Sequence, residues 1–348
     1  MNPSKSRNLR IGLVGCGRIF PNHLGALQAH SADCTLAAVC DIDSAALDAA
    51  VRQSGAAGYE DYQTMLAKEE LDVVSICTPS GLHPEQGMMA ARGGMHVIVE
   101  KPMALDLEQA DRLIEQCAEA GVQLFVVKQN RLNQAMQRLH QAVADNRFGQ
   151  IYGVYVNVFW RRTQAYYDQA DWRGTWALDG GAFMNQACHF VDAAQWLIGE
   201  VDSVTAITAT LARQIEVEDS GAAILRFRNG AIGTINVSML AYPDNREGSL
   251  MILGENGTAR VGGVALNQVE VWEFADQREE DEQIIRNQDG PPNVYGYGHT
   301  AYYRNVLDTL QGRGEPLTDG LSGRKSLELV LAIYQSADCG RKVQLPLS

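Results

Sequence analysis

With 348 residues, the chain is long enough that two domains are expected rather than a single hydrophobic core. Its composition, 46% hydrophobic and 20% charged, is typical of a soluble globular protein, and its net charge of -13 argues against nucleic acid as a partner. The seven cysteines include no Cys-x-x-Cys pair, which argues against a disulfide framework and a metal site. No apolar run approaches the roughly 20 residues of a membrane helix, and the polar start is a poor signal peptide. We therefore expect a cytoplasmic protein that binds no membrane.

In the first third of the chain, short apolar segments alternate with amphipathic segments of helical length. The predicted strands are Leu9–Val14, Thr35–Asp41, Val73–Thr78, His96–Val99 and Leu124–Val127. The predicted helices are His23–Ala29, Ser44–Gln53, Pro84–Ala91 and Leu107–Ala120. Strands separated by helices form right-handed βαβ units, so this pattern predicts a parallel sheet.

The rest of the chain predicts a mostly antiparallel sheet, because Asn229-Gly230 and Asn256-Gly257 are typical hairpin turns. The predicted strands are Ile151–Trp160, Val201–Thr210, Ala222–Phe227, Ala231–Met239, Leu250–Leu253, Thr258–Val261 and Gln268–Phe274. Helices are expected at Gln134–Asp145, Thr300–Gln311 and Gly320–Ala337, and a loop over Asp276–Tyr297. We place the domain boundary so that residues 1–127 form the first domain and residues 128–348 the second.

A glycine-rich turn follows the first predicted strand and precedes a helix. Gly15 and Gly17 would form a tight turn whose backbone N–H groups approach a pyrophosphate, next to Arg18 and Ile19. Phe20 stands where a third glycine is common, so the motif depends on its context between strand and helix.

Asp41 ends the next predicted strand, where an acidic residue of a dinucleotide-binding domain bonds the ribose 2′-hydroxyl. Ile42 and Asp43 follow it, and no arginine is present to bind a 2′-phosphate. This favours NAD over NADP as the cofactor. The alternative for Asp41 is a cap or turn residue for the following helix.

Two later strand ends carry further candidates. Thr78 and Pro79 end one strand and would face the cofactor, with His83 placed by Pro79; a simple turn and a helix-start histidine are the alternatives. Glu100-Lys101-Pro102 follows the strand His96–Val99, at the end of the sheet where ligands bind in such folds. Burial there can shift the pKa of a lysine so that it takes part in proton transfer. The alternative there is a surface turn.

In the second domain, Asn185 and His189 are four residues apart, so they would share one helix face. They could hold a substrate hydroxyl, with the histidine as general base. The glycines Gly180 and Gly181 just before them would allow a ligand to approach closely. A structural histidine is the alternative.

Together these motifs resemble the Gfo/Idh/MocA family of NAD(P)-dependent oxidoreductases. The resemblance implies an α/β fold with an N-terminal Rossmann parallel sheet and a C-terminal α/β domain with an open, mostly antiparallel sheet. In the family this sheet usually forms dimers or tetramers, so a homo-oligomer, up to a homotetramer, is expected. The family motif normally has aspartate where this chain has Asn185, an asparagine that the chain shares with the narrower group named below. We therefore expect His189 to be less basic here, because position 185 offers it no anionic partner.

Three further segments narrow the resemblance to the WlbA/WbpB group of this family: Val127–Arg131, Tyr166–Gln169 and Trp172–Trp176. That group oxidises the C3 hydroxyl of UDP-N-acetylglucosaminuronic acid in diamino-sugar biosynthesis for lipopolysaccharide O-antigen. It holds NAD tightly, and several members reoxidise NADH with 2-oxoglutarate. The resemblance implies the same substrate, cofactor and reoxidant for this chain.

Residue chemistry and resemblance together give the expected contacts, with Lys101, His189 and Asn185 as catalytic residues. The expected NAD contacts are Gly15, Gly17, Arg18, Ile19, Asp41, Ile42, Thr78, Pro79, His83, Glu100, Lys101, Gln129, Trp172 and Arg173. The expected substrate contacts are Lys101, Asn130, Arg161, Tyr166, Asn185, His189, Tyr297 and His299.

Several alternatives stay open. Arg161 and Arg162 could equally form a solvated basic edge, the aromatic residues could fill the core, and His299 could simply begin a helix. Either Lys101 or His189 could be the immediate base. The rival functions are another sugar or inositol dehydrogenase, and a non-catalytic NAD-sensing regulator. A sensor would not need to keep both Lys101 and His189.

Overall fold

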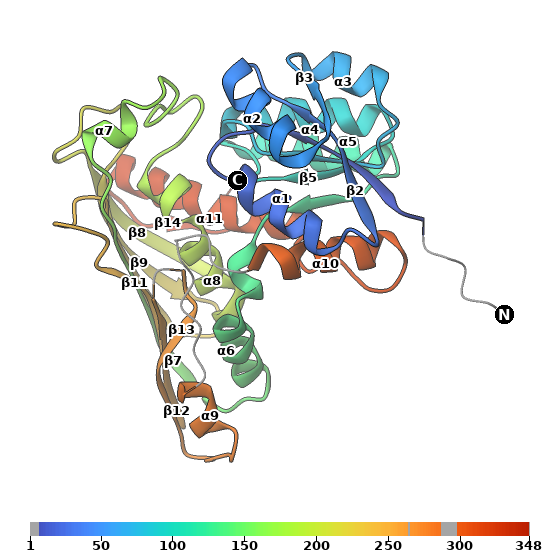
Figure 1. Ribbon diagram of the computed structural model, residues 1–348. Coiled ribbons are helices and arrows are strands. Elements are labelled where there is room, and N and C mark those ends of the chain that lie inside the picture. The colour runs from blue at the N-terminus through green and yellow to red at the C-terminus, as the bar shows by residue number, and fades with distance from the viewer. Residues whose placement is uncertain (1–6, 264, 287–297, 348) are drawn as a thin grey trace. The chain divides into compact units, whose positions relative to one another are not determined.

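The computed structural model describes residues 7–263, 265–286 and 298–347 (Figure 1). They form two compact units. Unit 1 contains Met1–Lys128 and His299–Arg324, and unit 2 contains Gln129–Gly298 and Lys325–Ser348. The return of the chain to unit 1 was not anticipated, and the division at residues 127 and 128 stays a prediction about separately folding domains. No described helix is long and apolar enough to cross a membrane.

Unit 1 contains a six-stranded parallel sheet in the order β3-β2-β1-β4-β5-β6, which confirms the predicted fold of the first part. The strands are β1 (Leu9–Val14), β2 (Cys34–Cys40), β3 (Ala57–Tyr59), β4 (Val73–Ile76), β5 (His96–Val99) and β6 (Leu124–Val126). The helices are α1 (Phe20–Ala29), α2 (Ser44–Ser54), α3 (Tyr62–Lys68), α4 (His83–Arg92), α5 (Leu107–Glu119) and α10 (Gly298–Leu310).

The central strands of this sheet are largely buried because helices cover the sheet. All four residues of β4 are buried, as expected for strands of a parallel sheet packed on both faces. Edge strand β3 and helix α3 were not predicted. β3 has three residues and none is buried, and α3 buries only Tyr62 and Met65, so neither has a readable apolar period.

Local signals explain where the helices begin and end. Asp106 accepts a hydrogen bond from the backbone N–H of Gln109 at 2.8 Å, which fixes the predicted start of α5. Gly55 ends α2 with φ +72°, a left-handed conformation that favours glycine.

Unit 2 contains an eight-stranded sheet in the order β13-β12-β11-β7-β10-β9-β8-β14. Among the described strands of this sheet only β7 and β10 pair in parallel, so the sheet is mostly antiparallel, as predicted. The strands are β7 (Ile151–Phe159), β8 (Val201–Ala209), β9 (Ser220–Phe227), β10 (Ile232–Ser238), β11 (Glu247–Gly254), β12 (Gly257–Gly262), β13 (Gln268–Phe274) and β14 (Val343–Gln344). The two predicted hairpin turns join β9 to β10 and β11 to β12.

Helices α6 (Gln134–Ala144) and α8 (Cys188–Ile198) lie on one face of this sheet (Figure 1). The remaining helices are α7 (Gln164–Tyr167), α9 (Asp281–Arg286) and α11 (Gly320–Cys339). On the opposite face, Ile207 and Ile224 are 73% and 61% exposed. Helix α9 falls where we predicted a loop, and that part of the prediction is wrong. Asp281 at its start accepts hydrogen bonds from Trp272, nine positions earlier, and from Arg147, a contact too distant in sequence to be predicted.

Candidate active site

The turn after β1 is tightly packed on one side and open on the other. Gly15 has φ +94°, and a Cβ added to it would lie 2.5 Å from the carbonyl carbon of Cys77. A Cβ added to Gly17 would meet no described atom within 4 Å. Gly15 is therefore required by the fold at the end of β4, whereas Gly17 leaves space into which phosphates can fit.

Helix α1 begins directly after this turn. Ile19 is its N-cap residue and provides no side-chain hydrogen bond, and the neighbouring Arg18 is exposed. In the first turn Pro21 has no N–H, and the N–H groups of Phe20 and Asn22 donate to the carbonyls of Gly17 and Ile19. The preference of this helix end for an anion therefore comes from the helix dipole. The turn and the helix together fit the pyrophosphate of a dinucleotide.

Asp41 fixes the glycine turn to the end of β2. Its carboxylate accepts hydrogen bonds from the backbone N–H groups of Cys16, at 2.6 Å, and Asp43, at 2.9 Å. The cap of α2 is Asp43, which accepts from Ala45 and Ala46, so the helix-cap alternative belongs to Asp43 and not to Asp41. Ile42 between them is 91% exposed. An acid and an exposed apolar side chain at this position suit a ribose and an adenine ring.

His83 lies behind two of the predicted cofactor turns. Its ring is buried, with Nε2 2.8 Å from the carbonyl oxygen of Thr78 and Nδ1 2.8 Å from that of Pro102. Both partners are acceptors, yet burial lowers the pKa of His83 and so favours the neutral ring with one N–H. As a neutral ring His83 donates to one of these carbonyls, and as an imidazolium to both, and in each state its buried ring packs against the Thr78-Pro79 and Lys101-Pro102 turns. This indicates a supporting role.

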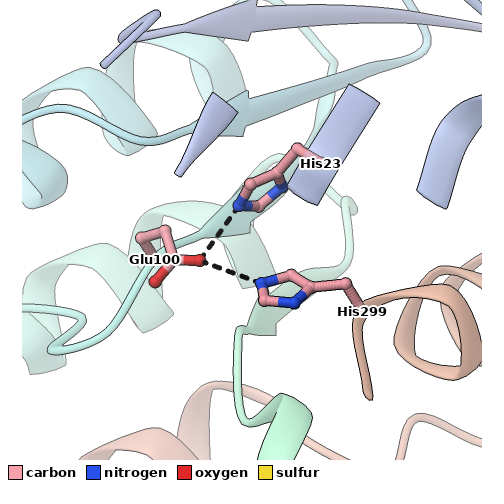
Figure 2. Close-up of side chains that lie close together, drawn as sticks. All are labelled: His23, Glu100 and His299. Atoms are coloured by element: carbon pink, nitrogen blue, oxygen red, sulfur yellow. Dashed lines mark hydrogen bonds and ion pairs between the residues drawn. The ribbon is translucent and has the colours of Figure 1, made fainter. Parts of the chain in front are cut away.

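Glu100 is buried next to Lys101 and supports its backbone. Glu100 Oε2 accepts the N–H of Lys101 at 3.1 Å, and Oε1 lies 3.0 Å from Nε2 of His23. Figure 2 shows that the ring of His299 also points at this carboxylate. The distance from His299 Nε2 to Glu100 Oε1 is 3.9 Å, too long for a good hydrogen bond. The ring of His299 is thus buried beside Glu100 without a good hydrogen bond to it.

In unit 2, Asn185 and His189 do not lie on one continuous α-helix, so that prediction is wrong. Ala182–Gln186 forms a π-helical turn, and α8 begins only at Cys188. The reason is a change of hydrogen-bond register, because the N–H of Ala187 donates to the carbonyl of Ala182, five residues back. Such π turns occur frequently at functional sites.

A buried carboxyl group holds the π turn in place. Glu218 Oε1 accepts hydrogen bonds from the N–H of Phe183 and the hydroxyl of Tyr334, both at 2.9 Å. The hydroxyl oxygen of Tyr334 in turn accepts from the N–H groups of Gly181 and Met184. A Cβ on Gly181 would collide with Glu218. The close approach that we predicted for a ligand at Gly181 is thus made by Glu218.

Asn185 is held by an acidic residue that we did not select. The buried carboxylate of Asp179 accepts hydrogen bonds from the side-chain amide of Asn185 and from the N–H of Gly174. Asn185 Oδ1 accepts from Gln186. A carboxylate is therefore present next to position 185 even though position 185 itself is neutral. His189 is buried at the start of α8.

Two arginines and Tyr166 extend this polar cluster. The guanidinium of Arg173 lies over the rings of Trp172 and Tyr166, 4.5 and 4.7 Å from their centroids, and donates to the Tyr166 hydroxyl. Arg162 donates to Gln186 at 2.8 Å. Arg161, the arginine that we selected, is exposed. Within unit 2, Arg162 and Arg173 are therefore the cations that lie with Tyr166 and Gln186.

Several residues that we predicted to contact a ligand have a buried polar atom that makes no hydrogen bond to the described residues. Gln129 Oε1, Asn130 Oδ1 and Arg173 Nε have no hydrogen-bond partner among the described residues, and the same holds for the ring nitrogens of His299. Buried polar atoms without a partner are costly, so such atoms fit positions completed by a ligand. Tyr297 lies outside the described residues.

Sequence reasoning missed His23, Tyr303, Asp179, Gln186 and Glu218. Only His23 carries a local signal, because it interrupts the buried face that Phe20, Leu24 and Leu27 form on α1. For the other four residues, no local sequence pattern indicates a role, and the partners of Tyr303 and Glu218 lie far away in the sequence.

Comparison with known proteins identifies related chains for both units. Residues 9–128 match the profile described as "Oxidoreductase family, NAD-binding Rossmann fold", and residues 140–345 match "Oxidoreductase family, C-terminal alpha/beta domain", both of Gfo/Idh/MocA type. Curated relatives include the D-apiose dehydrogenase of Paraburkholderia graminis, 29% identical over 96% of this chain and 88% of the relative. D-glucoside 3-dehydrogenase of Escherichia coli is 26% identical over 98% of each chain.

Two solved structures are more similar. The WlbA dehydrogenase of Bordetella pertussis, in complex with NADH and UDP-GlcNAcA, is 51% identical over 99% of this chain and 100% of that chain, with a TM-score of 0.93. The WlbA dehydrogenase of Chromobacterium violaceum, in complex with the same two ligands, is 52% identical over 100% of this chain and 99% of that chain, also with a TM-score of 0.93.

Proposed function

Because this chain belongs to the Gfo/Idh/MocA family of NAD-dependent oxidoreductases, within its WlbA-like group, we propose that it oxidises UDP-N-acetylglucosaminuronic acid. The reaction converts the C3 hydroxyl of the sugar to a ketone. The observation that carries the proposal is the 51% identity, over 99% of this chain, to a dehydrogenase solved with NADH and this sugar nucleotide. The curated relatives act on other sugars at less than 30% identity and support dehydrogenation alone.

The described residues of unit 1 fit the cofactor. NAD, when bound, supplies the hydride acceptor. The open space at Gly17 and the N-terminus of α1 suit its pyrophosphate, and Asp41 with Ile42 suits its adenosine. No lysine or arginine occurs from Asp41 to Asp43 to bind a 2′-phosphate.

The chain must also take the proton of the C3 hydroxyl as the C–H bond breaks. Two residues are candidates for this step: Lys101, whose backbone N–H donates to Glu100, and His189 at the start of α8. We propose that both act on the proton, one as its immediate acceptor and the other as a hydrogen-bond donor to the developing alkoxide. Asn185, held by Asp179, would orient the sugar.

The substrate carries a pyrophosphate and a carboxylate, so it needs cations. Arg173 is suited to this role because its Nε donor has no partner among the described residues and its guanidinium is stacked between two aromatic rings. Arg162 is the second candidate. Contacts from Arg161, Asn130 and Gln129 stay predictions.

The test compares NADH formation by the purified protein with UDP-GlcNAcA, UDP-GlcNAc and myo-inositol. We expect UDP-GlcNAcA to be the preferred substrate and the product to carry a ketone at C3 by NMR. If myo-inositol or another neutral sugar is oxidised faster, the substrate assignment is wrong. If no sugar reduces the cofactor, an NAD-sensing role is favoured instead. Addition of 2-oxoglutarate tests the proposed reoxidant, which should restore NAD and give repeated turnovers.

A further inference from the structure

A buried hydrogen-bonded chain stands directly behind Lys101 in unit 1. His23 Nε2 lies 3.0 Å from Glu100 Oε1, and His23 Nδ1 lies 2.8 Å from the Tyr303 hydroxyl. That hydroxyl lies 3.1 Å from Ser75 Oγ. The other oxygen of Glu100 accepts the backbone N–H of Lys101. Figure 2 shows His23 on α1, Glu100 after β5 and His299 at the start of α10 converging on one point.

The geometry accommodates a charged pair. As an imidazolium, His23 donates to Glu100 from Nε2 and to Tyr303 from Nδ1, and the Tyr303 hydroxyl can then donate to Ser75. Burial opposes both charges. Even so, Cys77, Tyr303 and the Glu100 carboxylate raise the pKa of His23 well above its usual value. The hydrogen bond and charge of His23, together with the charge of Lys101, lower the pKa of Glu100 well below its usual value.

The same three residues could in principle ligate a cation. One ligand atom from each of His23, Glu100 and His299 lies within 4.8 Å of the others. Metal binding requires neutral histidines with a free lone pair. Both nitrogens of His23 already have hydrogen-bond partners, and Glu100 Oε1 already serves His23, so an ion pair accounts for the cluster without a metal.

We propose that His23 is a positioning residue for the reaction: it compensates the charge of Glu100 and aims that carboxylate at the backbone of Lys101, so that the lysine amine can release and accept a proton. This rests on the proposed function, in which Lys101 takes part in the proton transfer. The charge of Lys101 acts on Glu100, and Coulomb's law makes this interaction reciprocal. Without His23, Glu100 would present an uncompensated negative charge that holds the lysine as an ammonium.

The groups that face this pair come from every element packed around it. They are Ser75 of β4, Cys77 after β4, His83 of α4, Lys101, and His299, Tyr302 and Tyr303 of α10. Burial raises the pKa of Tyr302 and of Tyr303, and burial lowers the pKa of His299, so these three are neutral near pH 7. The charged groups of this cluster are therefore His23, Glu100 and Lys101, and the substitutions below change the charges that act on Lys101.

The test is a pair of charge-neutralising variants, His23→Gln and the double variant His23→Gln/Glu100→Gln. Glutamine keeps an N–H donor for Glu100 but carries no charge. The matched control is His30→Gln, on the carbonyl end of the same helix, where His30 bonds the carbonyl of Thr300. The full-length proteins are compared by the pH dependence of turnover and by competitive acetylation of Lys101, read by mass spectrometry.

For His23→Gln we expect the pH profile of turnover and the pH profile of Lys101 acetylation both to shift to higher pH. At a given pH, acetylation of Lys101 should be roughly tenfold slower. The double variant should return toward the wild-type profile, because it removes the negative charge as well. An unchanged profile in His23→Gln, or no return in the double variant, would overturn the proposal. So would a stoichiometric divalent metal that His23→Gln loses.

Two further measurements keep the result interpretable. If His23→Gln does not fold, Tyr303→Phe replaces it, since it removes the hydrogen-bond partner of His23 Nδ1 and should shift the profiles in the same direction. Acetylation of Lys101 needs no substrate. If the wild-type protein does not oxidise UDP-GlcNAcA, the acetylation profiles still decide the role of His23, and the two failures are distinguishable.

Discussion

The side-chain amide of Asn185 donates a hydrogen bond to the buried carboxylate of Asp179. The resemblance to the family motif predicts that asparagine at position 185 removes a negative charge from this part of the protein. The charge is instead present six residues earlier in the chain. An amide at position 185 donates to that carboxylate at any pH, whereas an ionised carboxylate at this position would repel it.

The first prediction concerns this pair. Asn185→Asp should place two carboxylates in contact, so we expect lower thermal stability and lower turnover at pH 8, with partial recovery at pH 5 to 6 when one group binds a proton. Asn245→Asp is the matched control, because Asn245 accepts hydrogen bonds from Arg161 N–H and from Arg162. Equal pH dependence of the melting temperature in both variants would contradict the interpretation.

The second prediction concerns the proposed proton acceptors. Lys101→Ala and His189→Ala should each lower turnover by about 10²–10⁴-fold, the usual contribution of a general acid or base. Stopped-flow measurement of NADH formation gives the turnover, and NADH fluorescence checks that the cofactor still binds. Wild-type turnover in both variants would show that the site assignment is wrong.

The two glycines of the first turn should respond differently to alanine. Gly15→Ala forces a Cβ against the carbonyl of Cys77 at a positive φ, so we expect the free energy of unfolding to fall by roughly 1–3 kcal/mol. Gly17→Ala meets no described atom and should leave the melting temperature unchanged while weakening NADH binding. Urea unfolding and a fluorescence titration separate the two effects. Unchanged NADH affinity in Gly17→Ala would remove this turn from the cofactor site.

The fourth prediction is the pH dependence of stability at Glu218. Burial, the largest cause, raises the pKa of Glu218 to about 7. The folded state therefore binds a proton more tightly than the unfolded chain. The stabilisation is complete below the unfolded pKa and is lost as the pH rises to about 7, a change of roughly 3 kcal/mol at most.

Glu218→Gln should remove this slope, because glutamine keeps an acceptor for Tyr334 but does not ionise. The measurement is the free energy of unfolding in urea at several pH values between 4 and 8. Glu216→Gln, two residues earlier and exposed, is the control. A slope that persists in Glu218→Gln would assign it to another group.

The fifth prediction concerns the uncovered face of the sheet in unit 2. Ile207 and Ile224 are mostly exposed there, and large exposed apolar side chains on one face favour association. Ile207→Glu combined with Ile224→Glu should reduce the molar mass measured by light scattering to that of a smaller species. Leu321→Glu, an exposed leucine in unit 1, is the control. An unchanged mass would place any oligomer interface elsewhere.

The sequence predicted the parts of the protein that depend on local pattern. The strand, glycine turn and helix around Gly15 and Gly17 were predictable, since apolar periodicity and turn chemistry act within a few residues. The antiparallel sheet followed from its hairpin turns in the same way.

Contacts between distant residues could not be predicted. His23 meets Glu100 across 77 positions and Tyr303 across 280, and no local property of these residues encodes their pairing. The π turn at Asn185 also escaped prediction, because Glu218 and Tyr334, which hold it, lie 35 and 150 positions from the turn residues they bond.

The buried ring of His83 has a practical consequence for redesign of this protein. Because it links the carbonyls of Thr78 and Pro102, rebuilding the Thr78-Pro79 turn would also disturb the support of the neighbouring lysine. Cofactor preference and catalytic rate would then change together. Asp41, by contrast, accepts a hydrogen bond from the backbone N–H of Cys16 and makes no contact with His83 among the hydrogen bonds described above. An engineer who wishes to exchange NAD for another dinucleotide should therefore start at the exposed Ile42 and keep Asp41, which holds the glycine turn.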